Sequence, residues 1–116
     1  MVALHDHGAY FYHGKEKLVE VKNEHPALTS FKKEYYGGRS YASELARRGF
    51  VVLVIDAFYW GERRLQYREP PRELARLLSG LDPAQAAYVK AVNAYNRQRV
   101  YELNTWLNYC GTSWMG

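Results

Sequence analysis

The stretch Phe50-Val51-Val52-Leu53-Val54-Ile55-Asp56 decides the fold expected for this chain. It is a continuous run of apolar, mostly β-branched residues that ends in a carboxylate. A strand with one solvated face alternates apolar and polar residues, whereas a parallel strand covered on both faces is apolar throughout. We therefore expect residues 50–56 to form a central parallel strand of an α/β sheet.

The segment before this strand has the pattern of a helix that feeds it. Residues 40–48 carry apolar side chains at helical spacing, and Gly49 after two arginines is typical of a helix end. Helix, glycine, buried strand and loop make half of a right-handed crossover unit. Ligands of open α/β sheets bind beyond the carboxyl ends of the strands, which places a site near the loop 56–64.

One other apolar strand is available to pair with residues 50–56, namely Val2 to Leu4 at the start of the chain. Two strands do not make an independently stable parallel sheet. We therefore expect residues 1–116 to be a single, incomplete α/β domain, or a chain that forms a homo-oligomer through its exposed sheet edges.

The rest of the chain is expected to be loop and helix. Residues 18–36 contain Pro26 and are expected to form a loop with a short helical turn. A short helix is expected over Arg72 to Leu78. Asp82-Pro83-Ala84-Gln85 is typical of a helix start, and that helix should run to about Tyr109. Its apolar stripe consists of Val89, Val92, Val100, Leu103, Trp106, Leu107 and Cys110.

Composition narrows the class of protein. The hydrophobic content of 47% is that of a globular chain. The aromatic content of 16% has two interpretations. The aromatic residues line a ligand cleft or a covered interface, or they only fill the core and lie as tyrosines on the surface. The net charge of +4 comes from scattered pairs of basic residues, whereas a nucleic-acid site clusters them, so we expect no nucleic-acid partner.

The single cysteine fits a reducing compartment, because Cys110 has no partner for an internal disulfide. On the apolar stripe of its helix it is expected to be a small buried hydrophobe. The chain shows no signal peptide and no apolar run long enough to cross a bilayer. We expect a cytoplasmic protein with no membrane partner.

Four segments stand out in order along the chain: His5-Asp6-His7-Gly8-Ala9, Gly14-Lys15-Glu16-Lys17, Leu45 to Asp56, and Gly61-Glu62-Arg63-Arg64. Together they resemble α/β-hydrolases of the dienelactone hydrolase and acetyl xylan esterase-like group. The segment from Gly111 to Gly116 also looks like the part of that family that precedes the nucleophile region.

The resemblance implies a partial α/β-hydrolase fold and hydrolysis of a small-molecule carboxylic ester, with no cofactor. Such enzymes use a serine nucleophile, a histidine base, an acid and an oxyanion hole of backbone N–H groups. The matching donors are the amides of Gly8 and Ala9, although Ala9 departs from the family's second glycine. The matching substrate-binding residues are His7, Tyr10, Phe58, Tyr59, Trp60 and Arg63.

The catalytic triad has no match in this sequence. A nucleophile elbow reads G-x-S-x-G on a strand-to-helix turn. The nearest string, Gly111-x-Ser113-x-x-Gly116, is one residue too long and follows a helix. We therefore expect an oxyanion loop without a nucleophile, acid or base, and an isolated chain that is inactive.

Two other functions remain open at this point. One is a non-catalytic binding or assembly module that uses a truncated hydrolase scaffold. The other is a His-rich metal-binding fragment, because H-x-H spacing at a strand end can bind zinc; its ligands would come from His5, Asp6, His7 and His13. No further histidine or carboxylate motif follows to complete such a site, and we favour the oxyanion loop.

The charged residues near the expected site have structural interpretations as well as catalytic ones. Asp56 is expected to cap the following loop by accepting backbone N–H groups rather than to be catalytic. Glu62 and Arg63 are expected to pair with each other, with a substrate-facing Arg63 as the alternative. Lys15-Glu16-Lys17 is either a solvated run or a brace for the oxyanion loop.

Overall fold

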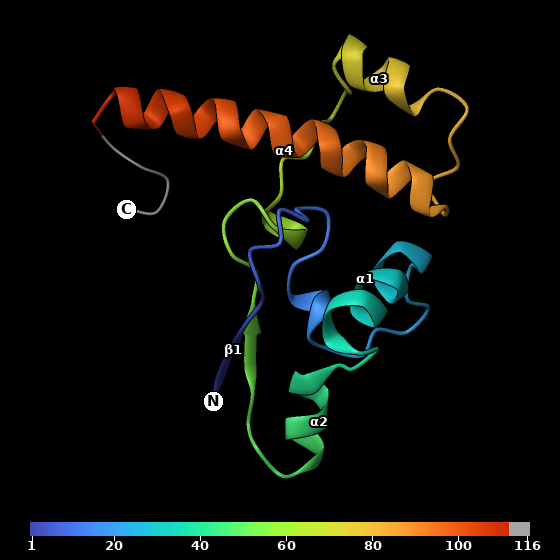
Figure 1. Cartoon of the computed structure of the whole chain (residues 1–116), viewed down its shortest axis with the longest axis vertical. Helices are drawn as coiled ribbons and strands as arrows, with labels where there is room; N and C mark the ends of the chain where they lie inside the picture. Colours follow the sequence, from blue (N-terminus) through green and yellow to red (C-terminus); the bar gives the residue numbers. More distant parts are fainter. Residues whose placement is uncertain (112–116) are drawn as a thin grey trace.

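The computed structural model describes residues 1–111, whose elements form two tiers (Figure 1). The lower tier holds the short sheet with two helices beside it, and the upper tier holds the remaining two helices. None of the helices in this described part has the length and apolarity needed to cross a membrane. In chain order the elements are β1 (Val2–Leu4), η1 (Lys15–Lys17), α1 (Pro26–Tyr36), α2 (Tyr41–Arg47), β2 (Leu53–Ile55), η2 (Gly61–Arg63), α3 (Arg72–Leu78) and α4 (Ala86–Tyr109).

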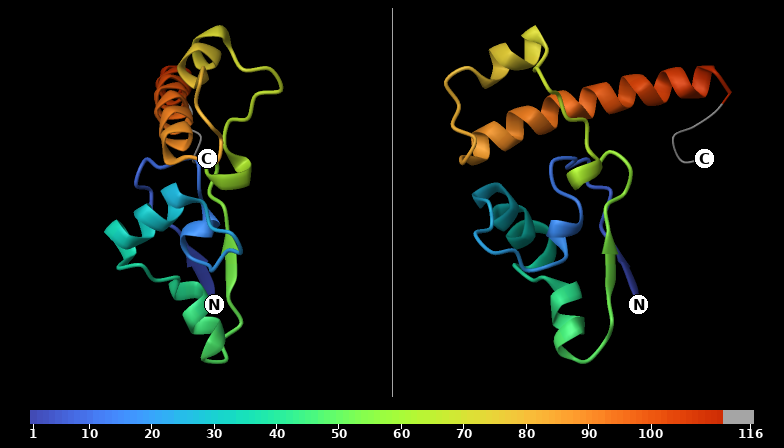
Figure 2. Two further views of the ribbon diagram at one scale, coloured as in Figure 1. Left: turned by 90° about the vertical axis from the view of Figure 1, so that its right-hand side faces the viewer. Right: turned by 180° about the vertical axis from the view of Figure 1, so that it is seen from behind.

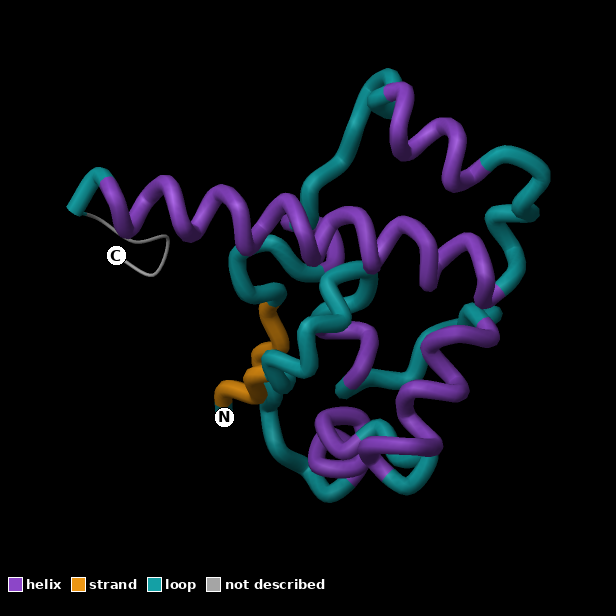
Figure 3. The backbone as a smooth tube through the Cα atoms, turned by 45° about the horizontal axis from the view of Figure 1, so that its top comes forward, coloured by secondary structure: helices purple, strands orange, loops and turns teal. Residues whose placement is uncertain are grey.

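The sheet consists of β1 and β2, which run parallel with Ala3 opposite Val54. Helix α2 lies in the connection between the strands. Gly49 follows the C-terminal end of this helix and has a φ of 92°. Figure 3 shows the two strands side by side. The mixed α/β character, the parallel pairing and the helix before β2 are therefore confirmed.

The strand expected to be buried on both faces is covered on one face only. Strand β2 is limited to residues 53–55, and the side chains of Val51 and Leu53 are 88% and 58% exposed. On the inner face, Val52 and Val54 pack against a cluster centred on Ala3, Leu18 and Ala42. The expectation of two-sided burial was wrong for this chain, because within residues 1–111 helices cover one side of the sheet.

A second expectation to correct is the loop at 18–36, since residues 26–36 form helix α1. Pro26 begins the helix rather than breaking it, because the first turn of a helix leaves its N–H groups unpaired in any case. The side chain of His25 caps this end by accepting from the N–H of Ala27. Gly37, with a φ of 61°, ends the helix in the left-handed conformation.

Helix α3 has the expected bounds, and α4 ends at the expected Tyr109 but begins at Ala86. The expected cap, Asp82, closes a separate turn instead. Its carboxylate accepts the N–H of Ala84 and its carbonyl accepts the N–H of Gln85, both at 2.9 Å. The proline motif therefore starts a turn that precedes the helix.

The apolar stripe of α4 is covered as far as Val100. Val89, Val92 and Val100 are buried, whereas Trp106 is 67% exposed. Figure 2 shows that the C-terminal half of α4 projects beyond the other elements. Cys110 lies on this projecting part and is exposed, so the expectation of a buried thiol was wrong.

Candidate functional site

The loop that follows β1 lines a cavity of about 500 Å³ between α1 and α4. Its walls combine aromatic rings with two cations, and the ring of Tyr10 stacks on that of Phe31 at 4.8 Å between centroids. The volume is within the range of small-molecule sites. Among the lining residues are Gly8, Ala9, Tyr10, Phe31, Lys90 and Arg97.

Two successive residues of this loop have positive φ angles, 42° at Gly8 and 49° at Ala9. Glycine is required at position 8, because a Cβ atom there would lie 2.2 Å from Oδ2 of Asp6. Ala9 adopts the left-handed conformation despite its side chain, which costs about 1–2 kcal/mol. The amides of both residues have no hydrogen-bond acceptor within residues 1–111, and both residues line the cavity.

Helix α4 holds the loop in place through Asn93. Its side-chain amide donates to the carbonyl of Ala9 at 3.3 Å, and its side-chain oxygen accepts the N–H of Tyr12 at 3.2 Å. Asn93 was not among the residues expected at the site from the sequence. The available signal was an asparagine directly after Val92 on the buried side of a helix, where a polar side chain needs a specific partner.

Below the loop, Asp6 connects η1 with α1. Lys17 is fully buried, with its Nζ 3.6 Å from Oδ2 of Asp6 and 4.8 Å from the ring centre of Phe31. Tyr36 donates its hydroxyl to Oδ1 of the same carboxylate. Burial lowers the pKa of Lys17 to about 8, against the opposing attraction of Asp6. Lys17 therefore braces the loop, and the expectation of a solvated run does not hold for it.

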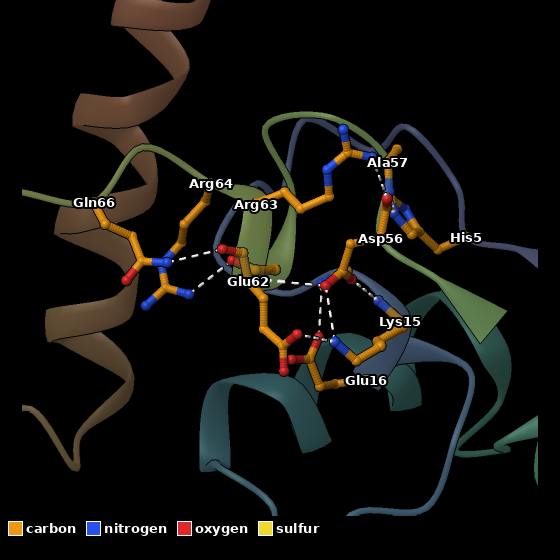
Figure 4. A network of polar contacts seen from close by, with 11 residues as sticks. His5, Lys15, Glu16, Asp56, Ala57, Glu62, Arg63, Arg64 and Gln66 are labelled. Carbon is orange, nitrogen blue, oxygen red and sulfur yellow. Dashed lines mark hydrogen bonds and ion pairs between the residues drawn. The ribbon is translucent and has the colours of Figure 1, made fainter.

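The carboxylate of Asp56, at the end of β2, joins the loop after β1 to the loop after β2 (Figure 4). It accepts the N–H of Lys15 at 2.6 Å, the ammonium of Lys15 at 3.0 Å and the N–H of Glu62 at 3.1 Å. A Cβ atom at Gly14 or Gly61 would lie 2.1 or 2.5 Å from Oδ1 of Asp56. The two glycines leave the space that the carboxylate fills, and the capping role of Asp56 is confirmed.

Electrostatics around Asp56 stabilise its charged form. Burial alone would raise the pKa of this carboxyl, but the hydrogen bonds from Lys15 and Glu62 outweigh burial and lower it. Glu62 contacts Nζ of Lys15 at 2.8 Å, while Arg63 donates to the carbonyl of Asp56 at 3.2 Å. The expected Glu62–Arg63 pair was therefore wrong: each residue has a different partner.

The other residues expected to bind substrate lie apart from this cavity. Tyr59 and Trp60 are buried in a cluster with Phe11 and Val100. The indole N–H of Trp60 donates to the carbonyl of His7 at 3.2 Å, so His7 shapes the loop through its backbone. Phe58 is partly exposed, with the guanidinium of Arg63 5.3 Å from its ring centre. Of the expected set, only Gly8, Ala9 and Tyr10 line the cavity.

The histidines stand in separate structural settings, and Nε2 of the buried His13 has no hydrogen-bond partner in the described part of the chain. Nδ1 of His5 is 2.9 Å from the carbonyl of Asp6, and its Nε2 accepts the N–H of Ala57. His13 is buried, and burial together with neighbouring cations lowers its pKa to about 4. Over residues 1–111, no three His, Cys, Asp or Glu side chains are grouped so that they could hold a metal ion.

Chemically, this arrangement offers backbone donors and cations to a negatively charged or polarised oxygen. Within residues 1–111 no histidine is hydrogen-bonded to a serine or cysteine side chain. Ser113 and the segment from 112 to 116 lie outside the described residues.

The sequence matches no family model, and searches among curated proteins and solved structures found nothing similar.

Proposed function

We propose that this chain is the oxyanion-loop section of a serine hydrolase that acts on carboxylic esters, with an α/β-hydrolase fold like that of dienelactone hydrolases and acetyl xylan esterases. The observation that carries the proposal is the pair Gly8 and Ala9. Both residues follow the carboxyl end of a parallel strand, have positive φ, and present amides without an acceptor in the described chain. Such preorganised donors stabilise the oxyanion of acyl transfer.

The surroundings of the loop support this proposal. The loop is held by three sets of contacts: those of Asn93, those of Asp6 with Lys17 and Tyr36, and those of the Asp56 network. An oxyanion hole needs this rigidity, because its donors must be in position before charge develops. The cavity next to the loop has room for a small ester, and its wall carries Lys90 and Arg97 together with the carboxylate of Glu34. The two cations outnumber this carboxylate, so the wall favours negative charge.

The bare outer face of the sheet supports the idea that further polypeptide completes the fold. Parallel sheets are covered on both faces, and here Val51 and Leu53 face solvent. We propose that the nucleophile, acid and base come from polypeptide other than the 116 residues of this chain, and that the chain alone hydrolyses no ester.

Titration with methylphosphonate, followed by amide NMR, tests the oxyanion loop. The phosphonate oxygens mimic a tetrahedral oxyanion, so the Gly8 and Ala9 signals should move. Gly37 and Gly38 are internal controls, because both have positive φ but stand in open space. Chloride at equal ionic strength controls for non-specific charge. If the Gly8 and Ala9 signals stay fixed, the loop is not an oxyanion site.

Fluorophosphonate labelling, measured by intact mass, tests where the nucleophile lies. We expect no adduct on the 116-residue chain. A stoichiometric adduct, mapped to Ser113 or to another serine, would place a competent nucleophile in this chain and contradict the proposed division of the active site.

The bare sheet face equally favours a second function, a non-catalytic assembly module that pairs its sheet with another copy of the chain. Eight large apolar residues of the strands and their flanks are exposed, and no charged residue lies between positions 50 and 55. Sedimentation velocity distinguishes the two functions when combined with the phosphonate titration. Self-association with unresponsive Gly8 and Ala9 amides would favour assembly. The exposed residues are Met1, Val2, Leu4, Phe50, Val51, Leu53, Ile55 and Phe58.

A further inference from the structure

The cavity of about 500 Å³ lies in the angle between α1 and α4, whose N-terminal ends are close together (Figure 1). There Nε2 of His25, the residue before α1, lies 3.1 Å from the carbonyl of Pro83 in the turn before α4. Each helix contributes one face to the cavity, with the small residues Ala27 and Ala86 among the lining. The chemistry of these two faces therefore decides which ligand the cavity accepts.

The face contributed by α1 is aromatic. Phe31 and Tyr35 line the cavity one helical turn apart, with their ring centroids 4.6 Å from each other. The ring of Tyr10, from the loop after β1, stacks on Phe31. Tyr35 is 62% exposed, so its ring is open to contact. Aromatic rings pair favourably with a second ring, and this face is therefore suited to a flat aromatic ligand.

A buried cation already contacts these rings. The ammonium of Lys17 is 4.8 Å from the ring centre of Phe31 and 5.9 Å from that of Tyr10, and Lys17 is fully buried. The negative face of an aromatic ring attracts cations, and here Lys17 already uses that attraction. The rings are therefore poorly suited to a ligand that is itself a cation.

The face contributed by α4 carries positive charge that the fold does not neutralise. Lys90 and Arg97 line the cavity, about 10 Å apart along the helix axis. Within residues 1–111 the side chain of Lys90 has no hydrogen bond or ion pair, and Arg97 has only a cation–π contact, 5.7 Å from the ring centre of Tyr101. Glu34, the carboxylate in the lining, is on the opposite helix and is engaged with the hydroxyl of Tyr35. Both cations are therefore available to an anionic group of a ligand.

We propose that the cavity is a binding site for small planar aromatic carboxylates. The ring lies against Phe31 and Tyr35, and the carboxylate points towards the cations of α4, away from the helix that carries Glu34. The amides of Gly8 and Ala9 supply further donors. Use of the cavity as an acyl pocket, with esters of aromatic acids as substrates, rests on the proposed function. The binding of aromatic carboxylates does not.

Amide NMR titration of the full chain with benzoate tests the proposal. Two further probes separate the ring from the charge: benzamide keeps the ring without the charge, and cyclohexanecarboxylate keeps the charge without the planar ring. We expect benzoate to bind roughly fivefold more tightly than either probe, as measured on the signals of Gly8, Ser30 and Asn93. Absence of benzoate binding, or an affinity no higher than that of one of the two probes, would overturn the proposal.

Exposed residues supply variants that leave the core intact. Lys90→Gln should weaken benzoate binding about threefold without changing benzamide binding, whereas Tyr35→Ala should weaken both about threefold. Glu34→Gln removes the carboxylate of the lining and should tighten benzoate binding about twofold. The matched control is Lys33→Gln, on α1 but outside the lining, which should change none of these affinities. Equal losses in Lys90→Gln and Lys33→Gln would attribute the effect to net charge and overturn the site.

The methylphosphonate titration separates this proposal from the proposed function. If methylphosphonate moves the Gly8 and Ala9 signals but benzoate does not bind, the oxyanion loop stands and the aromatic site is wrong. If benzoate binds with the expected dependence on Lys90 and Tyr35 while methylphosphonate leaves both signals fixed, the aromatic site stands and the ester chemistry is wrong.

Discussion

The ammonium group of Lys15 lies 3.0 Å from Oδ2 of Asp56, although 41 residues separate the two in sequence. Together with the N–H of Lys15, it fastens the loop after β1 to the end of β2. The same carboxylate is buried and sits in the space left by two glycines. The pairing of strands and the shape of the candidate site therefore depend on one side chain.

Asp56→Asn should reduce the free energy of unfolding by about 2–3 kcal/mol, because it removes a charge that is buried, paired and hydrogen-bonded. Lys15→Met should reduce the free energy of unfolding by a smaller amount, since Asp56 keeps its two backbone donors and Lys15 is partly exposed. Urea unfolding of the three proteins checks the order. An Asn variant as stable as the wild type would show that the network does not stabilise the fold.

Gly61→Ala should be far more destabilising than Gly80→Ala. Both glycines have positive φ, 54° and 75°, so both variants carry the strain of a left-handed alanine. At Gly61 the new Cβ would also meet the Asp56 carboxylate at 2.5 Å, whereas at Gly80 it meets open space. Thermal unfolding measures the difference, and equal losses of stability would contradict the steric argument.

Ala9→Gly should stabilise the chain by about 0.5 kcal/mol, because relief of the left-handed strain exceeds the added flexibility of the unfolded state. The matched control is Ala94→Gly on the exposed side of α4, which should destabilise by about 1 kcal/mol. Denaturant titrations give both values. Destabilisation by Ala9→Gly would mean that the alanine side chain makes a contact that outweighs its strain.

Acidification should destabilise the chain through His13. Its pKa in the folded protein is about 4, below the ordinary histidine value of 6.5, so the unfolded chain takes up the proton first. Stability is then lost as the pH falls from about 6.5 to 4, by up to about 3 kcal/mol. His13→Phe should flatten this part of the profile of unfolding free energy against pH, and an unchanged profile would assign the loss to other groups.

Self-association through the sheet should depend on its outer face. Leu53→Lys places a charge on that face and should shift sedimentation towards the monomer. Leu77→Lys on α3 is the control, since Leu77 has a similar exposure, 50% against 58%. A chain that is monomeric before any substitution, or one that responds equally to both, would count against pairing through the sheet.

The sequence predicted those parts of the fold that local chemistry determines. The apolar run at 50–56, the helix before it and the parallel partner at 2–4 all follow from residue type and spacing. Helix α1 was missed because Pro26 was interpreted as a break, although His25 before it provides a cap. The burial of β2 was overestimated. A continuous apolar run is typical of a strand covered on both faces, but within residues 1–111 other elements cover only one face of β2.

The candidate site was predictable at its loop and not at its supports. Gly8 and Ala9 were expected at the site because their loop resembles the oxyanion loop of a hydrolase family, and both residues line the cavity. Asn93 reaches the loop from a helix more than 80 residues later, and such a contact has no local signature. Trp60 was expected at the surface of a cleft but lies in the core, because an aromatic residue in a loop can pack inward as well as outward.

The wide separation of β1 and β2 has a consequence for biosynthesis. Val2 to Leu4 leaves the ribosome well before its partner, since Leu4 pairs opposite Ile55. At typical elongation rates of 5–20 residues per second, synthesis from position 5 to position 55 takes roughly 3–10 s. During that interval the apolar strand lacks its partner β2, which leaves it open to binding by chaperones.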